Sequence, residues 1–452
     1  MSQPYSYRPI DILENICIGC AHCMRVCPTE ALRVSDGKAK LHADWCVDCG
    51  ECFRVCPMRA IRARNDDYHD IFKYKHRILL VPELFFGQFS ERVSREMIYS
   101  VIGELGFTEV GAVEQCVDSL IPEINAYVEK ANKPVISSYC PAVVRLIQVR
   151  FPFLVDNIMQ LMPPIEITAR YYRSKLNEAG ISPEEAGIFY LSPCIGKIAA
   201  VKAPVGGYTS PITGVINMDF LYNKVYLAYK NRSPLTGKVK VNSALSSKGV
   251  EYSTTGGEKK HIKGRTLAVD GMDNVIDFLE LLENEKIKGV DYLELRACDE
   301  SCVGGILSHR NRFLGAESQR KYAEALPETH ELVEDYKKHT SAIIRMEPIE
   351  PRSLVKYDRD IEVALKKMEQ AQKLEKILPG IDCGACGAPS CESLAGDIVR
   401  GEKEIKSCIF LRTRYEKQGE ITPDEALDMM ESIWGKDRFK KPDKRQVEQT
   451  FE

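Results

Sequence analysis

The middle of the chain alternates short apolar runs with amphipathic helical patterns. The apolar runs lie at 78–82, 109–114, 134–139, 188–192 and 292–297. An amphipathic stretch separates the first two runs, and a second helical stretch precedes the third. Continuous apolar strands separated by helices are typical of a parallel sheet that helices cover on both faces. The pattern therefore predicts an α/β domain over residues 67–345.

The two ends of the chain follow other patterns. Residues 1–66 are rich in turns and clustered cysteines, and a charged, aromatic stretch at 62–77 marks the exit from this segment. Residues 346–378 are first punctuated by proline and then charged with helical periodicity, which we interpret as a connector. Residues 379–452 form a last segment. We thus expect a multidomain α/β and α+β protein with a small N-terminal domain and a small, mostly helical C-terminal domain.

Length, charge and hydropathy exclude several classes of function. With 452 residues, the chain should form several domains. Its net charge of -3 gives no overall attraction to nucleic acid or to an acidic membrane surface. No run reaches the roughly 18 apolar residues of a membrane span, and the first residues do not resemble a secretory signal. We therefore expect a cytoplasmic protein without nucleic-acid or membrane partners, and the absence of a dinucleotide or phosphate-loop motif predicts no nucleotide site.

The N-terminal segment carries one cysteine spacing twice. Both copies read C-x2-C-x2-C-x3-C-P, as in ferredoxins with two 4Fe-4S clusters, where the fourth cysteine of each copy ligates the other cluster. Zinc is disfavoured because no histidine stands at ligand spacing. The first cluster is predicted to use Cys17, Cys20, Cys23 and Cys56. The second cluster is predicted to use Cys46, Cys49, Cys52 and Cys27.

Four further cysteines follow three of the predicted strands. Cys140 directly follows the third run and precedes Pro141, which opens a helical pattern; Cys194 follows the fourth run, and Cys298 and Cys302 follow the fifth. In open parallel sheets, ligands bind beyond the carboxyl ends of the strands. Any one of these residues could be a buried cysteine at a strand end. All four together favour a shared metal site.

The last segment has a third cysteine pattern, C-x2-C-x4-C, with a fourth cysteine after sixteen intervening residues. Its spacing resembles the small 4Fe-4S domain of corrinoid iron-sulfur proteins and electron-transport complexes. Four cysteines can also hold a structural zinc, so both readings stay open. The predicted ligands are Cys383, Cys386, Cys391 and Cys408. Cys116 stands alone and is interpreted as a small buried hydrophobic residue.

The loops at 138–141, 193–197 and 294–305 resemble the three signature loops of the catalytic domain of FeFe-hydrogenases, in the same order. The resemblance covers about residues 1 to 345 and implies a two-lobed hydrogenase domain with parallel sheets. It implies that the four strand-end cysteines hold a 4Fe-4S cubane. Cys302 would also bridge to a two-iron centre with CO, cyanide and a dithiolate bridge. Lys197 matches the lysine that contacts a cyanide, a role that suits a compact cation with three donors.

The chain departs from the fast members of this family around the expected active site. Tyr139 stands where those members have a second cysteine that relays protons, and its ordinary pKa of about 10 lies further from neutrality than the thiol value of about 8.5. Ser192 and Arg296 replace methionines, and Ala200 replaces a glutamate. Glu123 matches a carboxylate of the proton path. Such departures resemble the sensory members of the family, which react slowly with hydrogen and report it.

These features predict an iron-sulfur hydrogenase that reversibly oxidises hydrogen to protons and electrons, slowly, for hydrogen sensing. Its expected partners are a ferredoxin-like electron carrier or signalling protein, and maturation proteins that install the two-iron centre. The alternative is a non-catalytic electron-transfer or cluster-assembly protein with the same cubane and no two-iron centre. Lys197 favours the enzyme, whereas Tyr139 and Arg296 favour the alternative.

Overall fold

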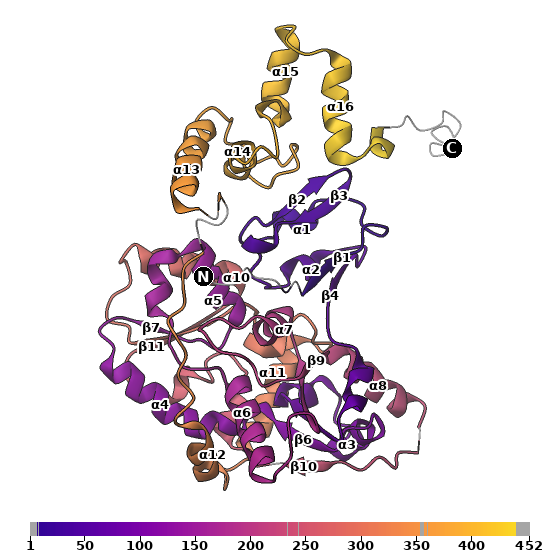
Figure 1. Ribbon diagram of the computed structural model, residues 1–452, viewed down its shortest axis with the longest axis vertical. Helices are drawn as coiled ribbons and strands as arrows, with labels where there is room; N and C mark the ends of the chain where they lie inside the picture. The colour runs from indigo at the N-terminus through magenta and orange to yellow at the C-terminus, as the bar shows by residue number, and fades with distance from the viewer. Residues whose placement is uncertain are drawn as a thin grey trace. The chain divides into compact units, whose positions relative to one another are not determined.

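A computed structural model describes residues 7, 9–232, 234–242, 244–352, 357–358 and 360–439. The chain divides into two compact units. Unit 1 takes in Val47–Gly50 and the described parts of Met1–Ile10 and Ala63–Pro351. Unit 2 takes in Asp11–Cys46, Glu51–Arg62 and the described part of Arg352–Glu452. Unit 1 contains the strands from β5 onward and unit 2 the helices from α13 onward (Figure 1).

The larger sheet of unit 1 has five parallel strands in the order β10-β6-β5-β8-β9. The central strands β5 and β8 are rich in buried apolar residues, as expected for strands covered on both faces. The strands are β10 (Lys240–Asn242), β6 (Glu109–Ala112), β5 (His76–Val81), β8 (Ala186–Ser192) and β9 (Gly214–Asn217). The expected parallel sheet is thus present.

A second parallel sheet in unit 1 has three strands in the order β11-β12-β7. These strands are β11 (Thr266–Asp270), β12 (Tyr292–Arg296) and β7 (Val135–Ile136). The apolar runs predicted β5, β6, β7, β8 and β12. They did not predict β9, β10 or β11, because in β9 a glycine and an asparagine flank just two apolar residues, and the other two strands contain polar, partly exposed positions.

Helices connect the parallel strands of unit 1. The helix α5 starts at Pro141 directly after the β7 loop, so the predicted helix start is confirmed. The helix α12 packs against α4 and α6, where the rings of Tyr171 and Tyr336 stack with centroids 3.8 Å apart. The helices are α3 (Arg95–Glu104), α4 (Val117–Lys130), α5 (Pro141–Arg150), α6 (Pro164–Glu178), α7 (Ile195–Lys202), α8 (Met218–Lys230), α9 (Ser247–Glu251), α10 (Met272–Glu283), α11 (Arg312–Glu324) and α12 (Val333–Thr340).

Unit 2 combines the N-terminal cysteine segment with the C-terminal helices. The hairpin of β2 (Leu32–Ser35) and β3 (Lys38–Leu41) is antiparallel, and β1 (Ile10–Ile12) lies next to β4 (Ile61–Ala63). The helices are α1 (His22–Arg25), α2 (Glu51–Val55), α13 (Ile361–Glu375), α14 (Cys391–Val399), α15 (Ile409–Lys417) and α16 (Pro423–Trp434). The expected fold class, α/β with parallel sheets between a ferredoxin-type segment and a mostly helical C-terminal segment, is confirmed.

Two packing arrangements bear on where the domains begin and end. The segment expected to be a connector contains α13, whose Ala364 and Ala371 pack in one hydrophobic core with Leu394 of α14. The helix α13 therefore belongs to the C-terminal module, which we define as residues 357–439. In addition, Val47–Gly50 pack with unit 1, although they belong to the N-terminal cysteine segment in sequence.

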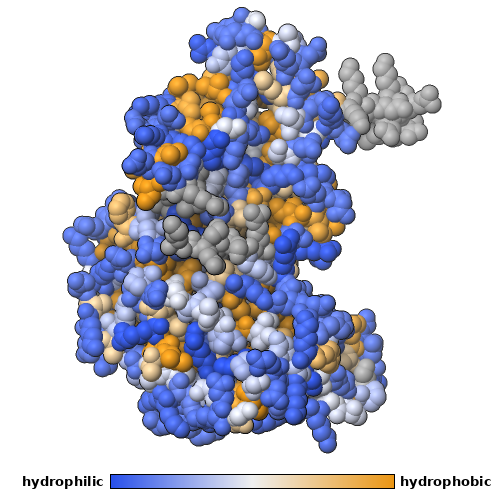
Figure 2. Space-filling model, viewed as in Figure 1, coloured by the Kyte–Doolittle hydropathy of each residue, from blue (hydrophilic) through white to orange (hydrophobic). Residues whose placement is uncertain are grey.

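The visible face is mostly hydrophilic, with small groups of hydrophobic residues (Figure 2). Scattered exposed hydrophobic side chains are normal in globular proteins. Within the described residues, none of the helices combines the length and the apolar character needed to cross a membrane.

Candidate metal centre

One cavity of unit 1 is lined by all four cysteines that follow strands. Cys140 and Cys194 are the N-cap residues of α5 and α7, and Cys302 lies in a short 3-10 helix after β12. Together with Cys298 they line a cavity of about 430 Å³. The structure thus brings together the four residues that the ends of parallel strands were expected to deliver to one place.

Close backbone packing holds the second and third loops together at this cavity. A Cβ atom at Gly305 would lie 2.8 Å from the carbonyl oxygen of Pro193 and 3.0 Å from that of Cys302, so only glycine fits. Glu300 and Ser301 have φ angles of 58° and 55°. Such left-handed conformations are strained for residues with a side chain and concentrate at functional sites.

The four sulfur atoms form a donor set that suits a positively charged centre. Burial raises the pKa of the Cys194 thiol to about 12, even though Lys197 lowers it. Burial and the neighbouring Cys302 also raise the pKa of Cys140. Neighbouring buried thiols ionise together when a metal supplies compensating charge. Four sulfur ligands suit an iron-sulfur cluster or zinc, so the residues fit the expected cubane.

A second cavity, of about 620 Å³, adjoins the first and shares Pro141 and Lys197 with it. Tyr139 and Ala200 line this second cavity. Burial alone would lower the pKa of Lys197, but Cys302 and Tyr139 raise it well above its ordinary value. The ammonium donates a hydrogen bond to the neutral Tyr139 hydroxyl at 3.1 Å. A buried cation with a neutral partner favours an anionic ligand in the cavity.

Two cations contact the ring of Tyr139. The Lys197 ammonium is 4.3 Å from the ring centroid, and the Arg296 guanidinium carbon is 4.1 Å from it. The ring of Tyr252 meets it edge-on at 5.2 Å. Burial, followed by the charge of Cys302, raises the pKa of Tyr139 well above 10. The phenol therefore keeps its proton at neutral pH.

A buried carboxylate that the sequence did not single out holds Arg296. The Arg296 guanidinium pairs with Glu258, which also accepts hydrogen bonds from Ser137 at 2.8 Å and from Tyr292 at 2.6 Å. Burial alone would lower the pKa of Arg296, but Glu258 and Glu294 raise it well above its ordinary value. Arg296 lines the first cavity. It is thus a fixed positive charge at the cysteine site.

The carboxylate predicted for the proton path, Glu123, lies half-buried on α4 and is not among the described residues that line either cavity. The buried Glu114 lies nearer, because its neighbour Val113 lines the second cavity. Burial and the adjacent Glu83 raise the pKa of Glu114 to about 8, although Lys197 lowers it. Sequence reasoning missed Glu114, since its only signal was a glutamate ending an apolar run.

Two residues of the second ferredoxin-type repeat also line the first cavity. Cys49 and Asp48 belong to unit 1 and line it together with the strand-end cysteines. Asp48 forms a buried ion pair with Arg145 of α5 at 2.8 Å. This ion pair fixes the segment 47–50 at the wall of the cavity.

The first predicted ferredoxin set is assembled in unit 2. Burial and the three other sulfur atoms raise the pKa of Cys23 to about 12. The N–H of Ala60 donates to the sulfur of Cys56 at 3.3 Å, and the N–H of Ala31 donates to that of Cys27 at 3.2 Å, as expected for a repeated motif. One cavity is lined by Cys17, Cys20, Cys23 and Cys56. The second set, Cys46, Cys49, Cys52 and Cys27, stays a prediction from spacing.

Three of the C-terminal cysteines lie close together, and the fourth packs against the same hydrophobic core. Burial, Cys383 and Cys408 raise the pKa of Cys386 to about 11. Cys391 packs against the same hydrophobic core as Cys386 and Cys408. Four sulfur ligands fit either a 4Fe-4S cluster or zinc, so the choice between them stays with experiment.

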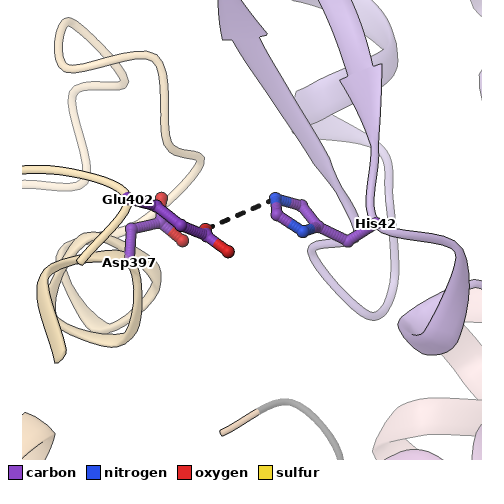
Figure 3. Close-up of side chains that lie close together, drawn as sticks. All are labelled: His42, Asp397 and Glu402. Atoms are coloured by element: carbon purple, nitrogen blue, oxygen red, sulfur yellow. Dashed lines mark ion pairs between the residues drawn. The ribbon is translucent and has the colours of Figure 1, made fainter. Parts of the chain in front are cut away.

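A further group of possible metal ligands lies in unit 2, where His42 faces Glu402 at 3.9 Å (Figure 3). Ligand atoms of His42, Asp397 and Glu402 lie within 4.8 Å of one another. However, Asp397 pairs with Arg33 and Arg400, and Arg400 also pairs with Glu402. Because two guanidinium groups balance two carboxylates, we interpret this group as an ion-pair network.

Three segments of the chain match known families. Residues 78–205 match the C-terminal domain of the iron-only hydrogenase large subunit. Residues 10–70 match a 4Fe-4S dicluster domain. Residues 378–410 match an Fe-S cluster family.

Curated relatives match over short segments. An uncharacterized protein of Methanocaldococcus jannaschii is 35% identical over 60 residues, which are 12% of this chain and 27% of the relative. One component of the ion-translocating oxidoreductase complex of Rhodobacter capsulatus is 43% identical over 37 residues, which are 8% of this chain and 20% of that protein. The matches thus span about a quarter or less of these relatives' length.

Solved structures of FeFe-hydrogenases are also similar. A variant of HydA1 from Chlamydomonas reinhardtii aligns with a TM-score of 0.45 and 13% identity over 62% of this chain and 95% of that chain. The structure of HydA(deltaEFG), reported for H-cluster assembly, aligns with a TM-score of 0.46 and 14% identity over the same shares. The chain is therefore similar to FeFe-hydrogenases over residues 78–205, and its N-terminal residues 10–70 match a ferredoxin-type domain.

Proposed function

We propose that this protein is an iron-sulfur hydrogenase that reversibly and slowly oxidises hydrogen to protons and electrons, and that it serves hydrogen sensing. The main support for this proposal is a pair of adjoining cavities. Four thiols line the first cavity, and Lys197 lines both the first and the second. One cavity alone would suit a simple cluster protein. The second provides a place for a further group with an anionic ligand. The clustered thiols favour the reducing cytoplasm as its location.

Several residues that line the two cavities have a role in this proposal. Cys140, Cys194, Cys298 and Cys302 would hold the cubane, and Cys302 would also be the protein ligand of the two-iron centre. That centre, when bound, supplies the binding and splitting of hydrogen. Lys197 would donate a hydrogen bond to an anionic cyanide ligand through its ammonium, whose high pKa keeps it charged. Arg296 keeps a second positive charge beside the cysteine sulfurs.

Slow turnover follows from the groups around the second cavity. Tyr139 holds its proton at neutral pH because its pKa is well above 10, and a relay works best near the operating pH. Ala200, on the same wall, offers no acceptor for a proton. A protein with slow proton exit is better suited to reporting hydrogen than to consuming it.

Electrons would leave through the iron-sulfur clusters. Cys49, a predicted ligand of the second ferredoxin-type cluster, lines the cysteine cavity. A ferredoxin-like carrier or a signalling protein would take the electrons, and maturation proteins would install the two-iron centre.

Infrared spectroscopy of protein matured in a host that also matures an ordinary FeFe-hydrogenase tests the proposal. The wild type should show CO and CN stretching bands that change under hydrogen, and Cys302→Ser should remove them. Cys116→Ser is the matched control, because Cys116 is a buried cysteine outside the predicted ligand sets. It should keep the bands.

The alternative, an electron-transfer or cluster-assembly protein, predicts a different result. Matured wild type would then carry its clusters and show no CO or CN bands. That outcome, with the ordinary hydrogenase matured in parallel, would refute the hydrogenase proposal.

A further inference from the structure

The C-terminal module packs on the hairpin of the ferredoxin segment, within unit 2. The N–H of Val34 on β2 donates to the carbonyl of Gly387, in the loop between Cys386 and Cys391, at 2.9 Å. The N–H groups of residues 36 and 37 donate to carbonyls of residues 432 and 433, near the end of α16, at 2.7 and 3.0 Å. The C-terminal module therefore binds strand β2 and the turn of the hairpin by main-chain hydrogen bonds.

Charged side chains reinforce this contact. Arg33 on β2 makes two hydrogen bonds to the carboxylate of Asp397 on α14, at 2.6 and 2.9 Å, and both residues are buried. Glu30 accepts hydrogen bonds from the hydroxyl groups of Ser390 and Ser393. Buried, two-pronged pairing of this kind fixes orientation as well as contact. The C-terminal module and the ferredoxin hairpin are thus held in a defined relative orientation.

Trp45 of the ferredoxin segment is enclosed by cations from both modules. The guanidinium of Arg400 lies 4.4 Å from its ring centroid, and that of Arg33 lies 5.5 Å away. Within the C-terminal module, the indole N–H of Trp434 at the end of α16 donates to the carbonyl of Ala385, in the cysteine loop, at 2.9 Å. This hydrogen bond joins α16 to the cysteine loop, and both of these elements also bond to the hairpin.

The contact places predicted ligands of two clusters on one cleft. Cys27 of the ferredoxin segment and Cys383 of the C-terminal set both line it, together with Met24 and Glu30. Cys383 is also exposed to solvent, whereas Cys386 and Cys408 are buried. One side of the C-terminal set thus faces a ferredoxin ligand, and the set also has access to an external partner.

We propose that the C-terminal site holds a 4Fe-4S cluster that exchanges electrons directly with the ferredoxin cluster ligated by Cys27. In each transfer, one reduced cluster gives up one electron and the oxidised neighbour takes up that electron, with no bond formed or broken. The C-terminal cluster is the outer end of the chain of clusters, and a low-potential one-electron carrier protein takes electrons there. The link to hydrogen rests on the proposed function, but the transfer between clusters does not.

A pair of glycine substitutions tests this contact. Gly387 and Gly401 have nearly equal φ angles, 77° and 78°, so alanine is similarly strained at both. At Gly387 a Cβ would lie 2.3 Å from the carbonyl oxygen of Val34, whereas at Gly401 nothing lies within 4 Å. Gly387→Ala should therefore separate the two modules, and Gly401→Ala should not.

The readout is electron paramagnetic resonance of the full chain, loaded with iron and sulfide and reduced with dithionite. Wild type and Gly401→Ala should show broadening from magnetic interaction between the C-terminal cluster and a ferredoxin cluster. Gly387→Ala should lose this interaction at equal iron content. Equal interaction in both glycine variants would overturn the proposal, as would zinc in the C-terminal site of the wild type. Because dithionite replaces hydrogen, a failure of the proposed function leaves this test unchanged.

If Gly387→Ala loses iron, a second pair of variants tests whether the contact between the modules is needed for the magnetic interaction. Arg33 is far in sequence from the C-terminal cysteines, and Arg33→Glu places a negative charge against Asp397. This variant should abolish the magnetic interaction between the two clusters while all clusters stay loaded. Lys40→Glu is the control on the same hairpin, since Lys40 pairs with Glu14 at the surface. An unchanged magnetic interaction in Arg33→Glu would refute the proposal.

Discussion

Substitution of Tyr139 separates its two contributions, the hydroxyl group and the ring. Tyr139→Phe removes the 3.1 Å hydrogen bond from Lys197 and keeps the ring in contact with both cations. A buried hydrogen bond to a charged group contributes about 1.5 to 3 kcal/mol, so we expect a loss of stability in that range. Turnover should stay low, because phenylalanine cannot relay a proton.

Tyr139→Cys removes the ring as well and places a thiol at the position. Loss of a buried aromatic side chain and of two cation–π contacts should lower the free energy of unfolding by on the order of 4 kcal/mol. A thiol ionises closer to neutral pH, and a positioned general acid or base contributes about 10²- to 10⁴-fold. We therefore expect a faster but less stable enzyme, with part of the gain lost because Arg296, Ser192 and Ala200 are unchanged.

The assay compares hydrogen evolution with hydrogen–deuterium exchange, since exchange needs no electron exit. Denaturant unfolding measures stability, and infrared spectra check that the two-iron centre is intact. If Tyr139→Cys leaves both rates at the wild-type level while the centre stays intact, the relay argument is wrong. The slow step must then be sought elsewhere, for example in electron exit.

Three further measurements check the site. Fully matured protein should contain about 18 iron atoms per chain, from four cubanes and one two-iron centre, and about half that amount with zinc in place of iron would contradict the cluster assignments. Gly305→Ala should lose the cubane in the cysteine cavity, because its Cβ meets a carbonyl at 2.8 Å, whereas Gly180→Ala has open space and should keep it. The carboxyl of Glu114 has its pKa raised from 4.5 to about 8 by burial and Glu83, so its contribution to stability falls as pH rises from about 4.5 to 8. Glu114→Gln should remove this fall and gain about 3 kcal/mol at pH 7, and an unchanged pH profile of unfolding would argue against a raised pKa.

The positions of the cysteines at strand ends and most of the central strands could be predicted from the sequence, because both depend on local pattern. Cys140 and Cys194 follow buried apolar runs, and such runs are visible without a structure. The groups around them depend on tertiary packing and left no local signal. Glu258 lies in a polar stretch that includes Lys259 and Lys260, and such a stretch ordinarily indicates a solvated surface, yet the Glu258 carboxylate is fully buried against Arg296.

The same limit applies to the ends of the chain. Helical periodicity predicted α13, but it did not show that α13 packs into the C-terminal core. The contact between the hairpin and the C-terminal module is made by main-chain groups and a buried ion pair. Almost any residue type can form main-chain hydrogen bonds, so no pattern of side chains in the sequence predicts them.

The ion pair between Arg33 and Asp397 has a consequence for biosynthesis. The two residues are 364 positions apart, and translation at about 5 to 20 residues per second separates their synthesis by roughly 20 to 70 s. During that interval the N-terminal hairpin leaves the ribosome with its edge open and Arg33 without its carboxylate. The ferredoxin segment can therefore reach its final form only after nearly the whole chain is made, and truncation before Asp397 would leave that edge exposed to aggregation.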